Sequence, residues 1–279
     1  MSVILTISSQ VVRGHVGNSA AVFALQQLGH DVWPLVTTTL AHHPGHGREV
    51  PQLVTPAEHL YRFVEALDQR GWLGQIDAVS TGYFAQEEQV RAAANILTLI
   101  KSVRPDALFL CDPVIGDSGG LYVTRDIAQN IHNLLVPTAD ILTPNLFEIG
   151  WLTNGAPATL KDIISQAASL GPAECLVSSA PSTGQNSVRT ILVNPPEAYS
   201  VYTPLISSTV HGAGDLLAAL YLGWRLMGES PSASLAKSMG GLNAVIEKTG
   251  KSGANELALI QMRDALRTLY PATVTTEHD

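Results

Sequence analysis

The sequence predicts an α/β fold in which a doubly wound, parallel sheet is flanked by helices on both faces. Short runs rich in β-branched residues alternate with longer segments of helical periodicity, as in chains built from βαβ units. The strand-like runs at 107–111 and 174–178 are apolar throughout, which is typical of strands buried on both faces. Residues 1–279 are expected to form one domain, because α/β folds of about 250 residues commonly form a single unit.

The first half of the chain is expected to alternate between strands and helices. Strands are predicted at 3–7, 32–36, 78–81 and 107–111, and helices at 18–28, 56–71 and 87–103. The helix at 56–71 has the clearest start signal, because Thr55, Pro56 and Glu58 form a capping-box pattern with proline at the first helical position.

The second half is expected to continue this alternation and to end in an antiparallel edge. Strands are predicted at 140–143 and 174–178, and helices at 146–153 and 160–169. Residues 190–202 predict a hairpin that turns at Asn194, Pro195 and Pro196. The chain after it is expected to be mostly helical up to Tyr270, and the patternless residues 273–279 are expected to form a mobile tail.

Composition and charge indicate a globular protein that acts on small molecules. Hydrophobic residues make up 46% of the chain and charged residues 14%. A net charge of −8 and a pI near 5.5 argue against nucleic acid or anionic membranes as partners, because both require a basic patch. The expected location is the cytoplasm, since the N-terminus carries no signal-peptide pattern and no apolar run reaches the roughly 20 residues that cross a bilayer. Cys111 and Cys175 lie in apolar runs and are expected to be reduced and buried.

Three short motifs match known patterns but lack the context that those patterns need. GDSGG at 116–120 would make Ser118 a nucleophile, but the βα alternation excludes the chymotrypsin-type barrel and the following glycines do not start a helix. Residues 250–252 end like a phosphate-binding P-loop, but Val245 stands where the earlier glycine is needed. Residues 212–217, GAGDLL, start like a dinucleotide-binding fingerprint. Leu217 stands where that fingerprint needs its third glycine or alanine, so the motif does not predict a dinucleotide site.

Three histidines lie in a loop rich in glycine and proline. His42, His43 and His46 have no acidic or cysteine residue clustered with them in the sequence. A solvated or substrate-facing loop is therefore a better interpretation than a zinc site.

Polar side chains follow the predicted strands at the positions where the strands end. Ligands of open α/β sheets bind beyond the carboxyl ends of the strands, so these residues are candidates for the functional site. They are Ser8, Ser9, Thr81, Gly82, Tyr83, Asp112, Asp117, Asn145, Glu148, Ser178 and Ser179.

The strongest single signal is His211-Gly212-Ala213-Gly214-Asp215, which leads directly into an apolar helix. Backbone N–H groups at a helix N-terminus form an anion site suited to a phosphoryl group in transfer. Asp215, in the first helical turn, can accept the proton of an attacking hydroxyl group. Alternatively, Asp215 only complements the helix dipole, and this motif alone leaves both interpretations open.

Phosphoryl transfer from ATP also requires Mg²⁺, which carboxylates, water and phosphates hold. Asp112, Asp117 and Glu148 each follow a predicted strand and so favour a kinase. For Glu148 alone, a solvated helix carboxylate is an equally good interpretation.

Five sequence blocks, taken in order, resemble pyridoxal kinases of the ribokinase superfamily. They are GHVGNSAAVFALQQLGHDVWPL, STGY, CDPVIGD, TPNLFE and the GAGD box, and together they span nearly the whole chain. The resemblance implies a ribokinase-like fold with a mostly parallel central sheet, a homodimer, and use of ATP with Mg²⁺, and it leaves open a monovalent cation such as K⁺. It implies phosphorylation of the 5′-hydroxymethyl group of pyridoxal, pyridoxine and pyridoxamine, in the salvage of vitamin B6 to pyridoxal 5′-phosphate.

The resemblance also implies roles for individual residues. Asp215 is expected to be the catalytic base, and Gly212, Ala213 and Gly214 the anion hole. The expected substrate contacts are Ser9, His43, Tyr83 and Asp215. The expected ATP contacts are Asp112, Asp117, Thr143, Asn145, Glu148, Ser178 and Ser179, of which Asp117 and Glu148 are also expected to hold the metal.

Three features depart from the family pattern. Pro44 follows His43 where many pyridoxal kinases have a threonine, and it offers the substrate neither a hydroxyl nor an N–H group. The run SGGLYV after CDPVIGD has no cysteine, whereas some bacterial members carry one there that can trap the aldehyde. The segment between Tyr202 and His211 is short, which implies a reduced cover over the nucleotide.

Two alternative functions stay open. A hydroxymethylpyrimidine kinase of thiamin biosynthesis would share the superfamily fold, but those enzymes usually have cysteine where Asp215 stands. A non-catalytic regulatory member would bind a pyridoxal compound without phosphorylating it. Pro44 and the short cover favour this second alternative, and the complete GAGD box with three further acidic residues argues against it.

Overall fold

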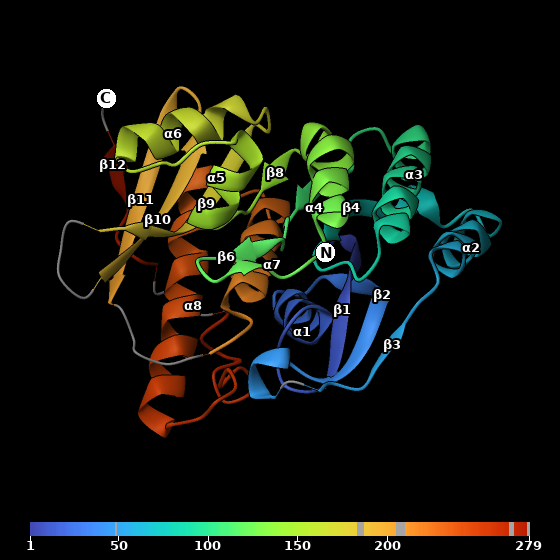
Figure 1. The fold of residues 1–279 in the computed structure, drawn as a ribbon, viewed down its shortest axis with the longest axis horizontal. Helices are drawn as coiled ribbons and strands as arrows, with labels where there is room; N and C mark the ends of the chain where they lie inside the picture. The colour runs from blue at the N-terminus through green and yellow to red at the C-terminus, as the bar shows by residue number, and fades with distance from the viewer. Residues whose placement is uncertain (48, 183–186, 205–209, 268–270, 278–279) are drawn as a thin grey trace.

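A ten-stranded sheet forms the centre of the protein (Figure 1). The computed structural model describes residues 1–47, 49–182, 187–204, 210–267 and 271–277. The strand order in the sheet is β12-β11-β10-β9-β8-β5-β4-β1-β2-β3. The strands are β1 Val3–Arg13, β2 Asp31–His42, β3 Gln52–Val54, β4 Ile76–Thr81, β5 Leu108–Cys111, β6 Gly116–Asp117, β7 Gly120–Leu121, β8 Ile141–Leu142, β9 Glu174–Pro181, β10 Ser187–Asn194, β11 Glu197–Pro204 and β12 Thr275–Glu277. The helices are α1 Asn18–Gln27, α2 Ala57–Asp68, α3 Glu87–Val103, α4 Arg125–Asn130, α5 Leu146–Thr153, α6 Leu160–Ser169, α7 Ala213–Leu226 and α8 Pro231–Ser252.

The central strands are parallel and the strands at both edges are antiparallel. Strands β2, β1, β4, β5, β8 and β9 pair in parallel. Strands β10, β11 and β12 extend the sheet in antiparallel fashion, and β3 does so at the opposite edge. The mostly parallel sheet predicted from the sequence is confirmed, and so is the hairpin, in which Pro195 and Pro196 join β10 to β11.

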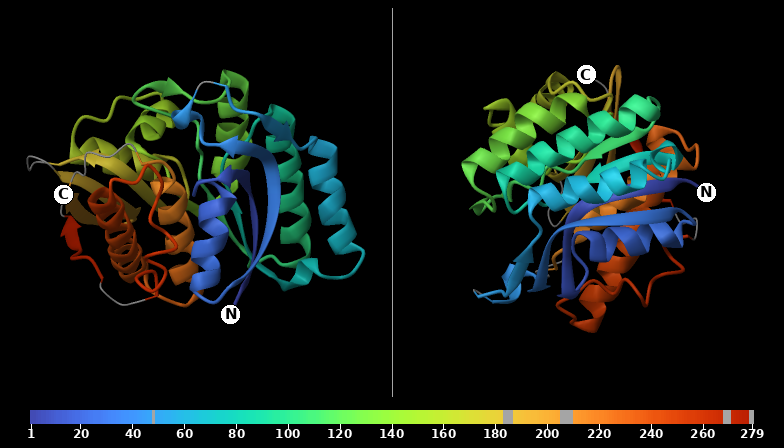
Figure 2. Two further views of the ribbon diagram at one scale, coloured as in Figure 1. Left: turned by 90° about the horizontal axis from the view of Figure 1, so that it is seen from below. Right: turned by 90° about the vertical axis from the view of Figure 1, so that its right-hand side faces the viewer.

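Helices cover both faces of this sheet and create two hydrophobic cores (Figures 1 and 2). One core packs α2, α3, α4, α5 and α6 against the sheet, and the other packs α1, α7 and α8 against the opposite face. Residues 108–111 of β5 contribute to both cores, which explains why that run is apolar throughout. None of the described helices is long and apolar enough to cross a membrane.

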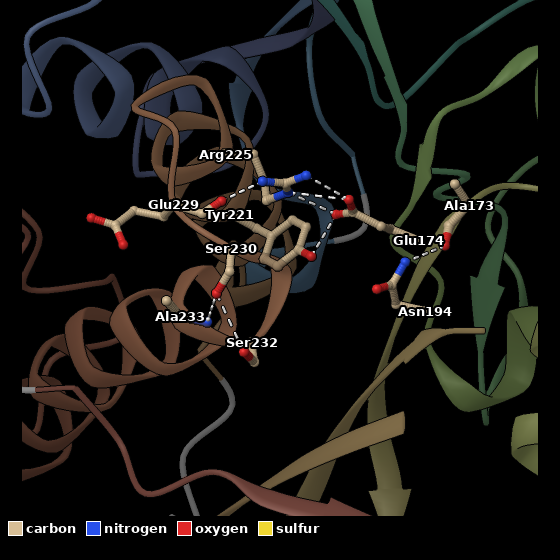
Figure 3. Close-up of polar contacts among 9 residues, drawn as sticks. All are labelled: Ala173, Glu174, Asn194, Tyr221, Arg225, Glu229, Ser230, Ser232 and Ala233. Carbon is tan, nitrogen blue, oxygen red and sulfur yellow. Dashed lines mark hydrogen bonds and ion pairs between the residues drawn. The ribbon is translucent and has the colours of Figure 1, made fainter. Parts of the chain in front are cut away.

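A buried ion pair joins the start of β9 to the second half of α7 (Figure 3). Arg225 Nη2 donates to Glu174 Oε1 at 2.8 Å, and its Nε lies 3.0 Å from Oε2. The Tyr221 hydroxyl donates to Glu174 Oε2 at 2.6 Å. Glu174 is only 7% exposed, so these three donors compensate a carboxylate that would otherwise be costly to bury.

The first two strands are longer than predicted. Strand β1 continues to Arg13 and β2 to His42, and they pair beyond a register shift between Ser8 and Gln10. The shift falls at the polar residues Ser8, Ser9 and Gln10, which interrupt the apolar run of β1. The prediction also missed the short strand β3, the β6–β7 hairpin and helix α4.

The predicted capping box at the start of the second helix is wrong. Helix α2 begins at Ala57, and Pro56 occupies the N-cap position without a side-chain hydrogen bond. Thr55 is held elsewhere, because its N–H donates to Thr37 O and its carbonyl accepts from Gln89 Nε2. The tie to β2 and α3 places Thr55 outside the helix.

Two expectations for the C-terminal region are also wrong. Helix α8 ends at Ser252, where Gly253 adopts a left-handed conformation with φ 64°, and residues 253–267 form no further helix. Residues 275–277 are not a mobile tail but form β12, which pairs with the otherwise open edge of β11. Residues 268–270 and 278–279 lie outside the described residues.

Candidate active site

The candidate site lies where the parallel strands β1, β4, β5 and β8 end and helix α7 begins. Asp112 follows β5, residues 143–145 follow β8, and Gly82 and Tyr83 follow β4. Ser8 and Ser178 lie inside longer strands than the sequence predicted, at the same edge of the sheet, and Ser178 bridges to Asn145. The strand-end residues are therefore brought together, as expected for an open α/β sheet.

The GAGD box forms a tight N-terminus for helix α7. Gly212 is the N-cap residue, with φ 90° and ψ 0°. A side chain at this position would collide with the backbone oxygen of His15, so only glycine fits both the conformation and the contact. The close approach brings the β1–α1 loop against the first turn of α7, where free N–H groups and the helix dipole favour an anion.

Asp215 lies in the first turn of α7 and is partly buried. Burial raises the pKa of Asp215 to about 6, although backbone hydrogen bonds from Gly17 and from Asp215 itself lower it. A carboxylate with this pKa is mostly ionised at neutral pH and still basic enough to accept a proton.

Asp112 and Glu148 complete an acidic cluster with Asp215. Burial raises the pKa of Asp112 well above its usual range, and the charges of Glu148 and Asp215 raise it further. The described residues include no Lys or Arg in an ion pair with any of these three carboxylates. The three carboxyl groups therefore share the sheet edge without a cation from the described chain, and the raised pKa of Asp112 favours its protonated form.

Glu148 holds the site together through the backbone. It forms a capping box with Asn145, whose N–H donates to Glu148 Oε2 at 2.8 Å. Its Oε1 accepts from the N–H groups of Ile115 at 2.8 Å and Gly116 at 3.4 Å. Burial raises the pKa of Glu148 to about 7 against these hydrogen bonds, which lower it. Both oxygens are thus occupied, so Glu148 fits a metal bound through water better than one bound directly.

Asp117 is exposed on the β6–β7 hairpin, where its Oδ1 accepts from Gly119 N at 2.7 Å. Its charge reaches both Glu148 and His211, so the hairpin faces the acidic cluster. Within the described ranges, no group of three or more His, Cys, Asp or Glu side chains forms a ready metal site. A Mg²⁺ ion here would take further ligands from nucleotide phosphates and water, which is usual for this ion.

The histidine loop folds over the start of α7. The His43 ring stacks on the His211 ring with centroids 3.8 Å apart, and Gly45 lies so close to His211 that a side chain would collide with it. Burial, with the neighbouring His211 and His46, lowers the pKa of His43 to about 4. His43 is therefore neutral at pH 7 and lies beside the GAGD box.

An acidic partner for this loop comes from a distant part of the chain. Glu256 Oε1 lies 2.8 Å from His46 Nε2 and 3.2 Å from Arg13 Nη1, and Glu256 Oε2 accepts from His15 N at 3.3 Å. The sequence shows no acidic residue clustered with these histidines, and the fold supplies one from a distant segment. Since 210 residues separate His46 from Glu256, no local pattern could have revealed the pair.

The other residues predicted to contact the substrate, Ser9 and Tyr83, lie at the same edge of the sheet. Ser9 is buried against Gly17, beside the loop that meets Asp215. The Tyr83 N–H donates to Ser8 Oγ at 3.2 Å, and the Tyr83 carbonyl accepts from Thr37 Oγ1 at 2.7 Å. These bonds fix the backbone of Tyr83 and leave its partly buried ring at the strand end.

The expected nucleotide contacts lie on the β8 and β9 side of the cluster. Thr143 is buried beside Asp112, and Asn145 Nδ2 donates to Gly116 O at 2.8 Å. Ser179 adopts a positive φ of 58°, which is uncommon for a non-glycine residue and marks a special backbone position. Residues 205–209, most of the short cover inferred from the sequence, lie outside the described residues.

The two cysteines are buried, as predicted from the apolar runs that contain them. Cys111 and Cys175 are buried and free, and burial raises the pKa of both thiols. A pocket of about 450 Å³ at the other side of α5, lined by His132, Val136 and Leu170 among others, contains no carboxylate. The acidic strand ends are the better candidate because charge, glycine backbone and histidine loop converge there.

Comparisons with known proteins agree with this geometry. The family model described as phosphomethylpyrimidine kinase matches residues 63–258. The chain is 36% identical over 270 residues to pyridoxal kinase PdxY of Corynebacterium diphtheriae, covering 94% of this chain and 95% of that protein. It is also 36% identical over 270 residues to pyridoxal kinase PdxY of Rubrobacter xylanophilus, covering 94% and 93%.

Solved structures give the same assignment. The pyridoxal kinase of Leishmania donovani in complex with ADP and pyridoxamine superposes with a TM-score of 0.93 at 27% identity, covering 100% of both chains. The pyridoxal kinase of Entamoeba histolytica superposes with a TM-score of 0.91 at 25% identity, covering 99% of both chains. This chain, with its acidic strand ends and GAGD box, therefore belongs to the pyridoxal kinase family.

Proposed function

We propose that this kinase transfers the terminal phosphoryl group of ATP to the 5′-hydroxymethyl group of pyridoxal, pyridoxine and pyridoxamine. The observation that carries the assignment of roles is Asp215, a carboxylate with a raised pKa, beside the glycine N-terminus of α7. The relatives support the substrate class, because those structures include complexes with pyridoxamine and pyridoxine. The product from pyridoxal is pyridoxal 5′-phosphate, so the reaction salvages vitamin B6.

In this proposal Asp215 removes the proton of the hydroxymethyl group as the hydroxymethyl oxygen attacks the γ-phosphorus of ATP, and the bond from that phosphorus to the bridging oxygen breaks to release ADP. The N–H groups of residues 212–214 face the charge that develops on the transferred phosphoryl group, and the dipole of α7 adds to their effect. Mg²⁺, when bound with the nucleotide, supplies positive charge to the phosphates. Asp117 and Glu148 would hold that ion, and Glu148 would act through water because its oxygens already accept backbone hydrogen bonds.

The remaining residues divide between the two substrates. Ser9, His43 and Tyr83 contact the pyridine compound, while Asp112, Thr143, Asn145, Ser178 and Ser179 line the ATP side. Pro44 leaves the loop with one donor fewer, and neither cysteine can reach the aldehyde. Preference among the vitamers then depends on polar contacts of about 0.5–1.5 kcal/mol each, so kcat/KM for pyridoxal and pyridoxine should agree within about a hundredfold.

A coupled ATP turnover assay tests the assignment. The three vitamers should be phosphorylated, and hydroxymethylpyrimidine, included because of the matched family model, should be a poor substrate. Asp215→Asn should lower kcat by at least about 100-fold while ATP still binds, because it removes the general base. Asp68→Asn, at an exposed position at the end of α2, is the matched control and should be unchanged. Near-normal turnover by Asp215→Asn would refute the role of Asp215.

We further propose that residues 1–279 form one domain that works as a cytoplasmic homodimer. The family resemblance supports the dimer. The exposed apolar side chains of Val12, on β1, and Leu53, on the edge strand β3, are consistent with a partner there. Light scattering would test the oligomeric state, and a monomer at micromolar concentration would contradict it.

A further inference from the structure

A small polar cavity lies beneath the catalytic aspartate, between the sheet and helices α1 and α7. Its volume is about 20 Å³, which is room for a single water molecule. Its polar lining includes Thr6 and Ser8 of β1, Asn18 of α1, and the two aspartates Asp112 and Asp215. The cavity therefore lies between strand β1 and the carboxylate that we propose as the base.

Three oxygen atoms of this lining are buried without a hydrogen-bond partner among the described residues: Thr6 Oγ1, Asn18 Oδ1 and Thr81 Oγ1. Thr81 lies against the Cys111 thiol, which leaves the oxygens of Thr6 and Asn18, residues that are each only 2% exposed, without any polar contact from the described chain. The other half of the Asn18 amide is satisfied, because Nδ2 donates to Ser8 O at 3.1 Å, and this bond fixes which end of the amide is the acceptor. A buried polar atom left without a partner is costly, so two of them around one cavity need an explanation.

The donor and acceptor types in the lining define what would satisfy it. Asn18 Oδ1 only accepts hydrogen bonds, the ionised Asp215 carboxylate only accepts them, and the Thr6 hydroxyl both donates and accepts. One water molecule donates twice and accepts twice. It can therefore donate to Asn18 and Asp215 and accept from Thr6, which completes all three groups within the available volume.

We propose that the cavity holds one ordered water that links Thr6 and Asn18 to the Asp215 carboxylate, so that Thr6 and Asn18 are positioning residues for the base. The proposal rests on the proposed role of Asp215. The water fixes the orientation of the carboxylate from below while its outer side faces the substrate. It also favours the charged form, because a hydrogen bond donated to a carboxylate stabilises the anion.

The backbone N–H groups of Gly17 and Asp215 already donate to the Asp215 carboxylate, and this water adds a further donor. The other acidic groups of the cluster are Asp112, at the end of β5, and Glu148, on α5, and the charges of Glu148 and Asp215 raise the pKa of Asp112. His211 precedes α7, and His43 stacks on it from the histidine loop. Burial keeps the pKa of both histidines low, so neither carries much positive charge at neutral pH. From α1, only the neutral Asn18 and Ala21 line the cavity.

The functional test uses Thr6→Val, which removes the hydroxyl and keeps the shape of the side chain. Loss of one hydrogen bond to the water should raise the pKa of Asp215 by about half to one unit. The acid limb of the kcat/KM profile for pyridoxal then moves up by the same amount. The rate should fall about two- to fivefold at pH 6 and hardly change at pH 8. Thr6→Ser keeps a hydroxyl at this position, so its acid limb should lie at the same pH as that of the unchanged enzyme.

Ser238→Ala is the matched control. Ser238 is a fully buried serine of α8 whose hydroxyl likewise has no partner among the described residues, but it does not line the cavity. Its removal should leave the acid limb in place. A limb that stays unchanged in Thr6→Val, or that moves equally in Ser238→Ala, would overturn the positioning role.

A crystal structure of the full chain, grown with Rb⁺ present, tests the occupant separately. Density for one atom within hydrogen-bond distance of Thr6 Oγ1 and Asn18 Oδ1, with no anomalous signal, supports the water. An anomalous Rb⁺ peak there would show a monovalent cation site instead, and an empty cavity would also overturn the proposal. This result does not depend on catalysis, so it distinguishes failure of the water site from failure of Asp215 as the base.

Discussion

Helix α7 carries two buried or partly buried acidic contacts, one near each end, and they are built in opposite ways. At its C-terminal half, Arg225 and Tyr221 donate to the carboxylate of Glu174 (Figure 3). At its N-terminus, Asp215 faces Asp112 and Glu148, and no cationic side chain of the described residues pairs with them. In the first arrangement a cation pairs with the carboxylate of Glu174. In the second, acidic side chains lie together without a cationic partner from the described part of the chain.

The difference indicates which cluster is structural and which is functional. A buried carboxylate with a bidentate arginine has all its partners within the protein, so it joins β9 to α7 and needs no ligand. Unpaired carboxylates with raised pKa values are costly to the fold, and such strain is typical of active sites, where substrates and ions supply the missing partners. Substitutions in the two clusters should therefore affect different properties of the enzyme.

The largest effect on stability is expected when the paired cluster is broken. Arg225→Met leaves Glu174, whose side chain is 9% exposed, without its cation, and should lower the free energy of unfolding by about 3–5 kcal/mol. Lys251→Met, which breaks the exposed Lys251–Glu247 pair on α8, should cost less than about 0.5 kcal/mol. Urea denaturation measures both. Equal losses in the two variants would show that the Glu174–Arg225 pair stabilises the fold no more than an exposed ion pair does.

The unpaired cluster should instead appear in the pH dependence of the reaction. The raised pKa of Asp215, about 6, places its protonation within the working range. Below this pH the base is protonated, so kcat/KM for pyridoxal should fall about tenfold per pH unit. The residual rate of Asp215→Asn should lack this limb. A profile that is flat down to pH 5 in the unchanged enzyme would contradict the assignment.

The smallest effect is expected at the exposed edge of the cluster. Asp117→Asn keeps an oxygen that can accept from Gly119 N but removes the charge, and should raise the Mg²⁺ concentration for half-maximal rate by about two- to tenfold. Glu148→Gln should raise it as well and also loosen residues 115–116, because an amide N–H would face backbone N–H groups. Unchanged Mg²⁺ dependence in both variants would rule out the metal role.

Local sequence patterns predicted the elements that local physics determines. Helices α3, α5 and α6 begin and end at the predicted residues, because their apolar periodicity and cap residues lie within the segments themselves. Long-range contacts account for the failures. Thr55 is tied to β2 and α3 instead of capping α2, and residues 275–277 form a strand only because β11 offers an open edge.

The same distinction applies to the site. The sequence identifies Asp215 and its glycines because one short motif contains them. It gives no sign that His211 stacks on His43, that Glu256 binds His46, or that Thr6 and Asn18 line a cavity beneath Asp215, because each contact joins residues far apart in the chain. Only the fold brings these groups together.

The stability of Asp215→Asn at pH 8 shows whether Asp215 is kept for chemistry at a cost to the fold. The pKa of Asp215 is raised above its unfolded value, so its contribution to stability is present below about pH 4 and is lost as the pH rises through about 6. Asparagine removes this penalty, and the free energy of unfolding at pH 8 should rise by about 1–3 kcal/mol while turnover is lost. A variant that is less stable than the unchanged protein at pH 8 would show that Asp215, like Glu174, is a structural carboxylate.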